Sequence, residues 1–435
     1  MTTTSGAIPA PETGVTPWSL KIGATFSERV KDLGPGAFVA ATFIGSGDVA
    51  TGGTAGGFFG LGYWWAYWVT CAVAWFCLDV VARYYVVTGK QGLSMFRELP
   101  YLGPILGLFL AVFGVYYGVG NVNSQFASTA WALQGLFPTI SFEIAAAVAA
   151  VACMALVWVG NYGWLEKIMT FMLLAIIGSF FAALIATGVN WGDAARGLLP
   201  YADPSGQFSS VFQAIAGTNI NGAAVLLFGY SLSERGNWPA KLEDKARFLS
   251  FARGNALLGS FGAVLVGFAI LGIINQVIYP YGIVPRKVED FAVLIEPVAG
   301  TWSIYIFSLG VLAASFSSAI GNGMVGAYVV AEFFGVPAEN KNIHFKMIYI
   351  LNSVVAAGLV LARIDPIFLK TITSMMNATF FGVVGLVLAY WAGSGRLGYF
   401  RNGGSIPLWA LTILTIVVAG YVGVFNLGGF VGLKF

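Results

Sequence analysis

Charged residues are scarce in this chain. Of its 435 residues only 9% are Asp, Glu, Lys or Arg, while 58% are hydrophobic. Soluble domains carry about 25% charged residues, so this balance excludes an ordinary soluble fold and indicates a polytopic membrane protein embedded in a lipid bilayer. The net charge of +3 is also too small to favour nucleic acid as a partner.

Histidine and cysteine are nearly absent as well. The single histidine, His344, is expected at the surface, so no histidine-based proton relay is available. Cys71, Cys77 and Cys153 lie within apolar segments without Cys-x-x-Cys spacing, and we expect them to be packing residues. A Walker loop, a GxGxxG after a strand and a Ser/His/Asp set are missing too. This excludes an ATP-driven pump and leaves no sign of an enzyme or of a bound cofactor.

What the chain has instead is long apolar runs. A spanning helix needs about 20 mostly apolar residues, and we predict an all-α protein with about eleven transmembrane helices. The eleven segments cover approximately residues 35–58, 62–87, 102–136, 141–159, 164–188, 209–233, 251–277, 299–334, 345–363, 367–392 and 406–430.

The basic residues are distributed unevenly between the connections. If the N-terminus is cytoplasmic, 16 of the 22 Lys and Arg residues fall on the cytoplasmic side, which fits the positive-inside rule. An odd number of segments then puts the C-terminus outside. Residues 1–33 lack the apolar core of a signal peptide, so we expect a flexible cytoplasmic tail. The expected location is the inner (plasma) membrane of a prokaryotic cell.

Two of the apolar segments are interrupted by polar, glycine-containing stretches at matching positions. The first contains GSGDVATGGTAGG from residue 45, and the sixth, five helices later, contains GTNINGAA at 217–224. Such a pair is typical of a transporter with inverted repeats, whose binding site lies at the membrane midplane. The alternative is that the glycines only allow close packing between helices.

Asp48, in the first interruption, is the main candidate for a binding residue. An aspartate near the bilayer centre costs about 2.5–3.5 kcal/mol, so a partner or a function must compensate. Carboxylate, amide and carbonyl oxygens together suit a hard cation such as Mg²⁺, Mn²⁺, Ca²⁺ or Na⁺. The asparagines could instead only cap the half-helices. The expected neighbours of Asp48 are Gly45, Ser46, Thr218, Asn219 and Asn221.

Other polar residues inside the apolar segments mark a candidate path through the membrane. Asn123 and Gln125 lie in the third segment, and Ser315 lies in the eighth. Their side chains could face a water-filled path or form hydrogen bonds between helices. None of the three is ionisable, so none could carry a proton.

Three ionisable residues near segment ends have simpler interpretations. Asp79 and Arg83, four residues apart near the end of the second segment, are expected to form an intrahelical pair. Glu332, at the end of the eighth segment, is expected to reach the cytoplasmic interface.

Four stretches, in order along the chain, resemble the NRAMP family of divalent-metal transporters. GPGAFVAATFIGSGDVATGG is similar to the family's first helix, which an Asp-Pro-Gly-Asn motif interrupts. VVARYYVVTGKQGLS, YGWLEKIMTFMLL and LAASFSSAIGNGMVGAYVVAEFF resemble parts of its helices 2, 5 and 8. The resemblance implies a LeuT-type fold of two inverted five-helix repeats plus one extra helix, with helices 1 and 6 broken. It also implies alternating access.

The chain departs from the family within the site that the resemblance implies. Gly45 takes the place of the family's metal-binding Asp, and Asp48 the place of its metal-binding Asn. Asn221 takes the place of the metal-binding Met, and Ala223 that of a His. The two remaining ligand positions would therefore be Asp48 and Asn221. Gln125 stands where many members have an acidic residue of the proton route.

These departures lead to a specific functional prediction. Replacing a thioether by an amide removes a soft ligand, so the transported cation is expected to be Mg²⁺ or Mn²⁺ rather than a softer metal. Without the histidine and the acids, transport is expected not to be coupled to protons. The alternatives are a carrier of a small organic solute, with or without a coupling Na⁺, and a membrane scaffold that does not transport.

The resemblance also divides the chain into parts. The first repeat is expected at residues 34–208, the second at 209–393, and the eleventh helix with the C-terminus at 394–435. We expect the protein to be a monomer that meets only its metal-ion substrate and the lipid bilayer.

Overall fold

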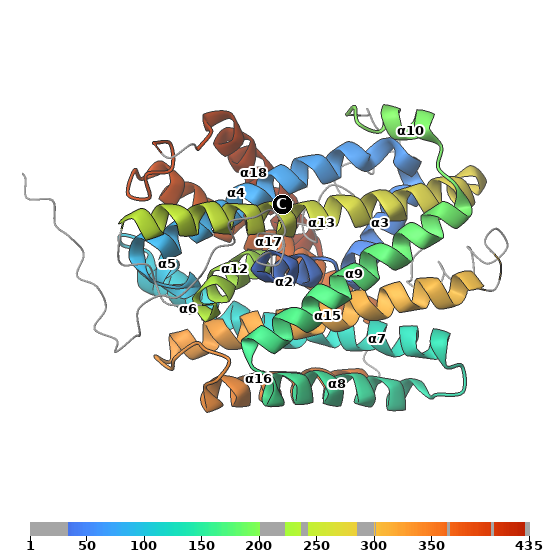
Figure 1. Ribbon diagram of the computed structural model, residues 1–435, viewed down its shortest axis with the longest axis horizontal. Helices are drawn as coiled ribbons and strands as arrows, with labels where there is room; N and C mark the ends of the chain where they lie inside the picture. Colours follow the sequence, from blue (N-terminus) through green and yellow to red (C-terminus); the bar gives the residue numbers. More distant parts are fainter. Residues whose placement is uncertain are drawn as a thin grey trace, which may run out of the picture.

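The computed structural model describes residues 34–200, 222–235, 242–284, 300, 302–362, 366–401 and 404–430. Within these ranges the secondary structure is helical (Figure 1). In a bilayer each backbone N–H and C=O group needs a partner within the protein, and a helix supplies these partners within one segment. The apolar composition therefore determines the helical class directly.

The described part of the chain contains helices for all eleven predicted segments. Seven helices are long and apolar enough to span a membrane, and four shorter helices are apolar. The helices are α2 (Gly34–Phe43), α3 (Ser46–Phe59), α4 (Trp64–Thr88), α6 (Gly103–Tyr116), α7 (Val122–Leu136), α8 (Phe142–Val159), α9 (Tyr162–Thr187), α12 (Gly222–Glu234), α13 (Leu242–Val277), α15 (Trp302–Phe333), α16 (Ile343–Leu361), α17 (Pro366–Gly393) and α18 (Ile406–Phe430).

The predicted boundaries hold within a few residues, with two exceptions. The seventh segment begins at Leu242 rather than near residue 251, because the charged stretch LEDKARFLS continues the helix beyond its apolar part. The sixth segment is described only from Gly222 onward. Two short helices in the connections, α5 (Gly92–Arg97) and α10 (Trp191–Arg196), were not predicted.

The third segment is interrupted as well, which the sequence analysis did not predict. A π-helical turn, η2 (Tyr117–Asn121), separates α6 from α7. Such turns often occur at functional sites in helices. At this turn α15 approaches closely, since a Cβ atom on Gly326 would lie 2.8 Å from the Cα atom of Gly118.

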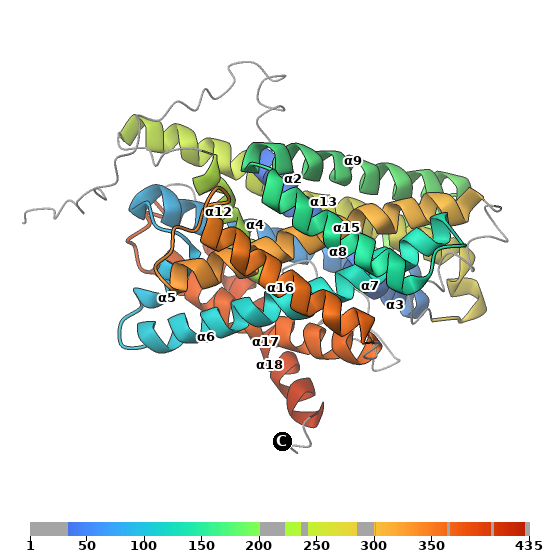
Figure 2. The ribbon, with the colours of Figure 1, turned by 90° about the horizontal axis from the view of Figure 1, so that it is seen from below.

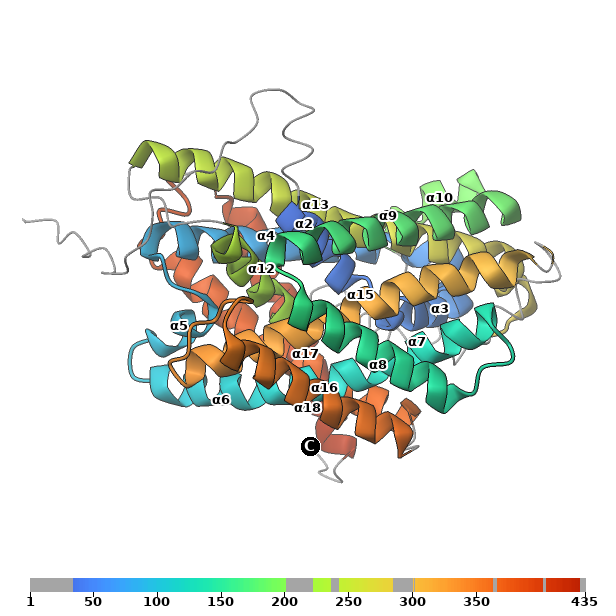
Figure 3. The ribbon, with the colours of Figure 1, turned by 60° about the horizontal axis from the view of Figure 1, so that its bottom comes forward.

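Two long helices, α13 and α15, organise the interior. α13 packs against α2, α3, α4 and α9, and α15 packs against α2, α6, α7, α9 and α16. α8 and α16 lie side by side away from α13, and α17 pairs with α18 (Figures 2 and 3). The ten residues of α2 are all buried. The first broken helix is therefore enclosed by protein rather than exposed to lipid.

Candidate functional site

The helix break in the first segment is short. α2 ends at Phe43, Ile44 and Gly45 are not helical, and α3 begins at Ser46. The expectation that GSGDVATGGTAGG as a whole forms the interruption was therefore wrong in extent, because helix resumes directly after its first residue. Asp48 stabilises this restart, since its Oδ2 atom accepts a hydrogen bond of 2.9 Å from the Gly45 N–H. A carboxylate in the first turn also interacts favourably with the helix dipole.

Gly45 lies where the break contacts two other helices. A Cβ atom at this position would lie 2.7 Å from Ser318 Oγ on α15 and 3.0 Å from Gln125 Nε2 on α7. Both distances are shorter than an ordinary van der Waals contact. A side chain at residue 45 would therefore require Ser318 and Gln125 to move.

Neutral side chains satisfy the backbone groups that the break exposes. Gln125 Oε1 accepts hydrogen bonds from the Ser46 N–H (3.2 Å) and from Ser46 Oγ (3.0 Å). On the other side, Ser317 Oγ donates to the Ala41 carbonyl (2.8 Å) and Ser318 Oγ to the Thr42 carbonyl (2.9 Å). The Ile44 carbonyl accepts no backbone hydrogen bond within the part of the chain that the structure describes.

Asp48 itself is deeply buried, with 5% of its surface exposed. Two tyrosines, Tyr67 of α4 and Tyr117 of η2, lie close enough to interact electrostatically with its carboxylate. The Tyr67 hydroxyl also faces α3, because a Cβ atom on Gly52 would lie 3.0 Å from it. Among the described residues, neither tyrosine hydroxyl has a hydrogen-bond partner. These two oxygens are available beside Asp48.

The sequence analysis did not identify Tyr67 and Tyr117. Neither residue lies in one of the two predicted interruptions, and both belong to aromatic stretches that are common in membrane helices. Both tyrosines belong to elements other than α3 and interact with Asp48 only in the folded protein, so no local signal could have found them.

The three predicted path residues lie in different surroundings. Gln125 contacts the break directly, as described above. Asn123, two residues earlier, points elsewhere and donates to the Ala356 carbonyl on α16 (3.2 Å). Ser315 donates to the Val311 carbonyl (2.7 Å), and its Oγ lies 2.9 Å from Thr129 Oγ1 on α7. Gln125 therefore belongs to the site, whereas Asn123 and Ser315 lie in the seams between α7 and its neighbours.

The predicted residues of the sixth segment, Thr218, Asn219 and Asn221, lie outside the described residues. Helix α12 is described from Gly222 onward. Within the described ranges no group of three or more His, Cys, Asp or Glu side chains gathers. In that part of the chain the candidate site is one carboxylate among neutral oxygen groups.

Solved structures with the same architecture are transporters. A crystal structure of the manganese transporter of Eremococcus coleocola superposes with a TM-score of 0.81, at 16% identity, over 98% of this chain and 92% of that one. The nucleobase-cation-symport-1 family transporter Mhp1 superposes with a TM-score of 0.60, at 14% identity, over 92% of both chains. The fold is thus the LeuT-type arrangement that the sequence predicted.

Sequence comparison gives the family. The divalent metal cation transporter MntH of Caldanaerobacter subterraneus subsp. tengcongensis is 23% identical over 359 residues, which cover 80% of this chain and 81% of that protein. The model of the family described as natural resistance-associated macrophage protein-like matches residues 36–425. Because this match covers most of the chain, the protein is an integral membrane protein that belongs to the Nramp family.

Proposed function

We propose that this protein transports a divalent metal cation across the membrane by alternating access and that Asp48 is the charged group that binds the cation. The observation that supports this most is a buried carboxylate at the break of a helix that protein encloses. A half-helix that ends there, α2, directs the negative end of its dipole at the same place. Relatives named as divalent-metal and manganese transporters support the same substrate class.

The groups around Asp48 favour a hard cation. The Ile44 carbonyl and the hydroxyls of Tyr67 and Tyr117 are oxygen groups, as are the side chain of Ser46 and, in the sixth segment, those of Thr218, Asn219 and Asn221. Mg²⁺ and Mn²⁺ prefer such ligands, and Mg²⁺ commonly keeps several waters and uses only one or two carboxylates. We therefore propose Mg²⁺ or Mn²⁺ as the substrate, with Asp48 and Asn221 as direct ligands and Gly45 within the site.

We further propose that transport is not coupled to protons. Gln125, which contacts the break, and Asn123, Ser315 and Thr129, which lie between α7 and its neighbours, are amides and hydroxyls that do not titrate near neutral pH. The membrane potential alone contributes about 4.6 kcal/mol to the entry of a divalent cation at 100 mV. This is enough to drive uptake with the N-terminus in the cytoplasm, the orientation that the basic residues favour.

A flux measurement tests the proposal. The protein is reconstituted in liposomes that contain dyes for Mg²⁺, Mn²⁺ and pH, and a membrane potential is applied. We expect divalent uptake without acidification in the wild type, and loss of uptake in Asp48→Asn. The matched control is Glu339→Gln, which removes one negative charge from an exposed ion pair with Lys341 and should transport normally. Absence of divalent flux at any potential would refute the proposal.

A second variant tests the choice of cation. Asn221→Met restores a soft ligand at the position where the resemblance places a methionine. Binding of Cd²⁺ and Mn²⁺ should then increase relative to Mg²⁺. Isothermal titration with the three metals measures this ranking, and an unchanged ranking would show that Asn221 is not a ligand.

A further inference from the structure

Two helices carry the same short pattern at the same end of the molecule. The sequence YSLSE at 230–234 ends α12, and YVVAE at 328–332 lies near the end of α15. Tyrosine and glutamate four residues apart lie on one face of a helix. The two helices contact each other, so the two patterns can meet.

The structure pairs the two patterns crosswise. The Tyr230 hydroxyl donates to Glu332 Oε2 (2.6 Å), and the Tyr328 hydroxyl donates to Glu234 Oε1 (2.9 Å). The two tyrosine rings stack between these hydrogen bonds, with centroids 4.8 Å apart and planes inclined by 8°. The glutamate of each helix thus holds the tyrosine of the other. We call these four residues the Tyr–Glu latch.

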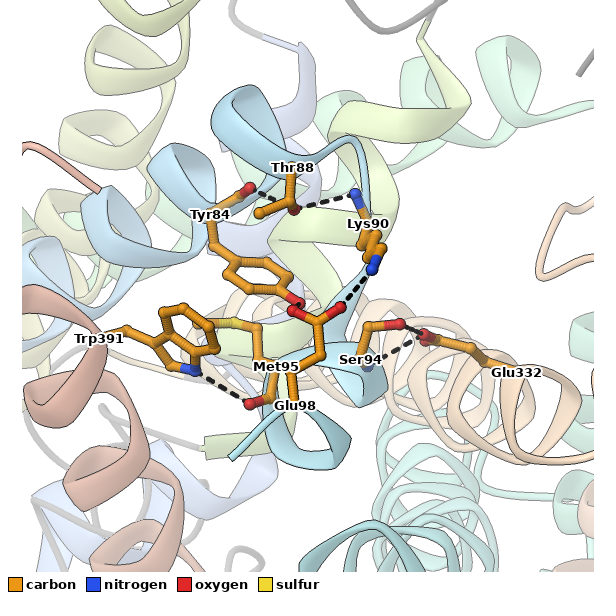
Figure 4. Close-up of polar contacts among 8 residues, drawn as sticks. All are labelled: Tyr84, Thr88, Lys90, Ser94, Met95, Glu98, Glu332 and Trp391. Atoms are coloured by element: carbon orange, nitrogen blue, oxygen red, sulfur yellow. Dashed lines mark hydrogen bonds and ion pairs between the residues drawn. The ribbon is translucent and has the colours of Figure 1, made fainter. Parts of the chain in front are cut away.

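Each carboxylate of the Tyr–Glu latch is also bound to a third segment. Glu332 accepts hydrogen bonds from the N–H (3.0 Å) and the Oγ (2.7 Å) of Ser94 of α5 (Figure 4). It also accepts one from the N–H of Leu93 (3.1 Å). Glu234 accepts one from the N–H of Asn340, in the connection between α15 and α16. Glu332 thus fastens α5 and α12 to α15, and its position at the cytoplasmic interface stays a prediction.

The Tyr–Glu latch is suited to breaking and forming again. Both tyrosines are fully buried and fill the seam between the helices, whereas both glutamates are partly exposed. The hydrogen bonds are charge-assisted, and therefore strong, but water can replace the tyrosine hydroxyl at a partly exposed carboxylate. In a fully buried ion pair, by contrast, water cannot reach the carboxylate to replace its partner.

We propose that the Tyr–Glu latch closes the end of the molecule at which α5 lies, here called the α5 end. Its opening lets the cation pass between Asp48 and this end. The inference rests on the proposed transport function. The sequence predicts that α12 is the half-helix after the break of the sixth segment, and such half-helices move relative to the rest of a transporter in alternating access. Separation of α12 from α15 breaks both tyrosine–glutamate bonds together. The four residues are therefore positioning residues for gating.

Thiol labelling measures the opening without any metal. Ser231→Cys places a reporter beside Tyr230 at a position that is 0% exposed, and the full chain is labelled in liposomes with a water-soluble maleimide. In the reporter background we compare Tyr230→Phe, Tyr328→Phe and Glu332→Gln, which keep the shape of each side chain. Losing a charge-assisted hydrogen bond should raise the labelling rate about tenfold in each. The labelling rate of the double variant, Tyr230→Phe with Glu332→Gln, should be close to that of either single variant, because both changes remove the same hydrogen bond.

Matched controls separate opening from loosening. Tyr84→Phe removes a similar bond at the same end, from the Tyr84 hydroxyl to Glu98 Oε2 (2.9 Å), but this bond joins α4 to the segment after α5 (Figure 4). It should leave labelling unchanged. The native Cys77 and Cys153, both buried, should stay unlabelled in every variant.

The outcomes decide the proposal. An unchanged rate in both tyrosine variants would overturn it, as would an equal rise in Tyr84→Phe or labelling of Cys77 and Cys153 at the same rate. Because the readout needs no cation, a failure of the divalent flux assay and a failure of the Tyr–Glu latch are distinguished.

Discussion

The buried carboxylates at the helix break and at the α5 end of the molecule have different kinds of neighbours. At the break, one carboxylate, Asp48, accepts a hydrogen bond from a backbone N–H and lies beside two tyrosines. At the α5 end, the two most deeply buried carboxylates bind arginines: Asp79 binds Arg83 and Arg253, and Glu166 binds Arg235. Asp79 and Glu166 are thus neutralised by arginines, whereas the groups described around Asp48 include a backbone N–H and two tyrosines, which suit a site that admits a cation.

The group around Asp79 shows what a structural charge looks like here. Its two carboxylate oxygens each lie 2.9 Å from an arginine Nε, that of Arg83 and that of Arg253 on α13. Asp79 and Arg83 are 0% and 1% exposed. The Arg83 guanidinium also lies over the ring of Tyr399, 5.0 Å from its centroid. The charges, the aromatic ring and three segments of the chain are thus locked together.

The largest expected effect is therefore that of Asp79→Ala. This change leaves Arg83 buried without its carboxylate, which costs about 3–5 kcal/mol of unfolding free energy. Thermal unfolding in detergent, followed by intrinsic fluorescence, should show a strongly lowered midpoint. The control is Lys90→Ala, which breaks the more exposed pair of Lys90 with Glu98 and should cost less than about 1 kcal/mol. Equal shifts of the unfolding midpoint in Asp79→Ala and Lys90→Ala would contradict a special structural role for the buried Asp79.

The two regions also differ in how much of them the sequence could predict. The Asp79–Arg83 pair was predicted and is confirmed, because both residues belong to one helix and their spacing determines the contact. Arg253 was missed, since it comes from another helix. At the break, the position of the interruption and the contact between Ser46 and Gln125 could not be derived in detail. They depend on how α3, α7 and α15 pack.

The fold could be predicted more completely than the site. Lipid forces apolar segments to be helices, so eleven segments and their approximate ends follow from composition. Tyr67, Tyr117 and the crossed Tyr–Glu latch depend on side chains that meet across helices distant in sequence. Contacts of this kind leave no pattern in any short stretch of a single sequence.

An intermediate effect is expected where the break contacts its neighbours. Gly45→Ala places a methyl group 2.7 Å from Ser318 Oγ, and such overpacking costs about 1–3 kcal/mol. Adding Ser318→Ala removes that oxygen and should recover part of the loss, although the Ser318 Cβ remains 3.1 Å away. The same unfolding measurement on the two single variants and the double variant gives the coupling. If the double variant loses as much unfolding free energy as the two single variants together, residue 45 does not contact Ser318 as described.

The smallest effect on stability is expected at the one charge of the break. In Asp48→Asn the amide oxygen can still accept the hydrogen bond from the Gly45 N–H, because both carboxylates and amides accept this bond at the third position of a helix. The change also removes the cost of keeping a charge inside the membrane, about 2.5–3.5 kcal/mol. The unfolding midpoint should therefore stay unchanged or rise, while divalent uptake is lost. Asp48→Ala, which removes the acceptor as well, should be less stable than Asp48→Asn by about 1 kcal/mol, the net contribution of one hydrogen bond. A fall in stability of Asp48→Asn comparable to that of Asp79→Ala would mean that Asp48 has a fixed cationic partner. Asp48 would then be neutralised by a fixed cationic side chain, as Asp79 is, and a transported cation would not be needed at the break.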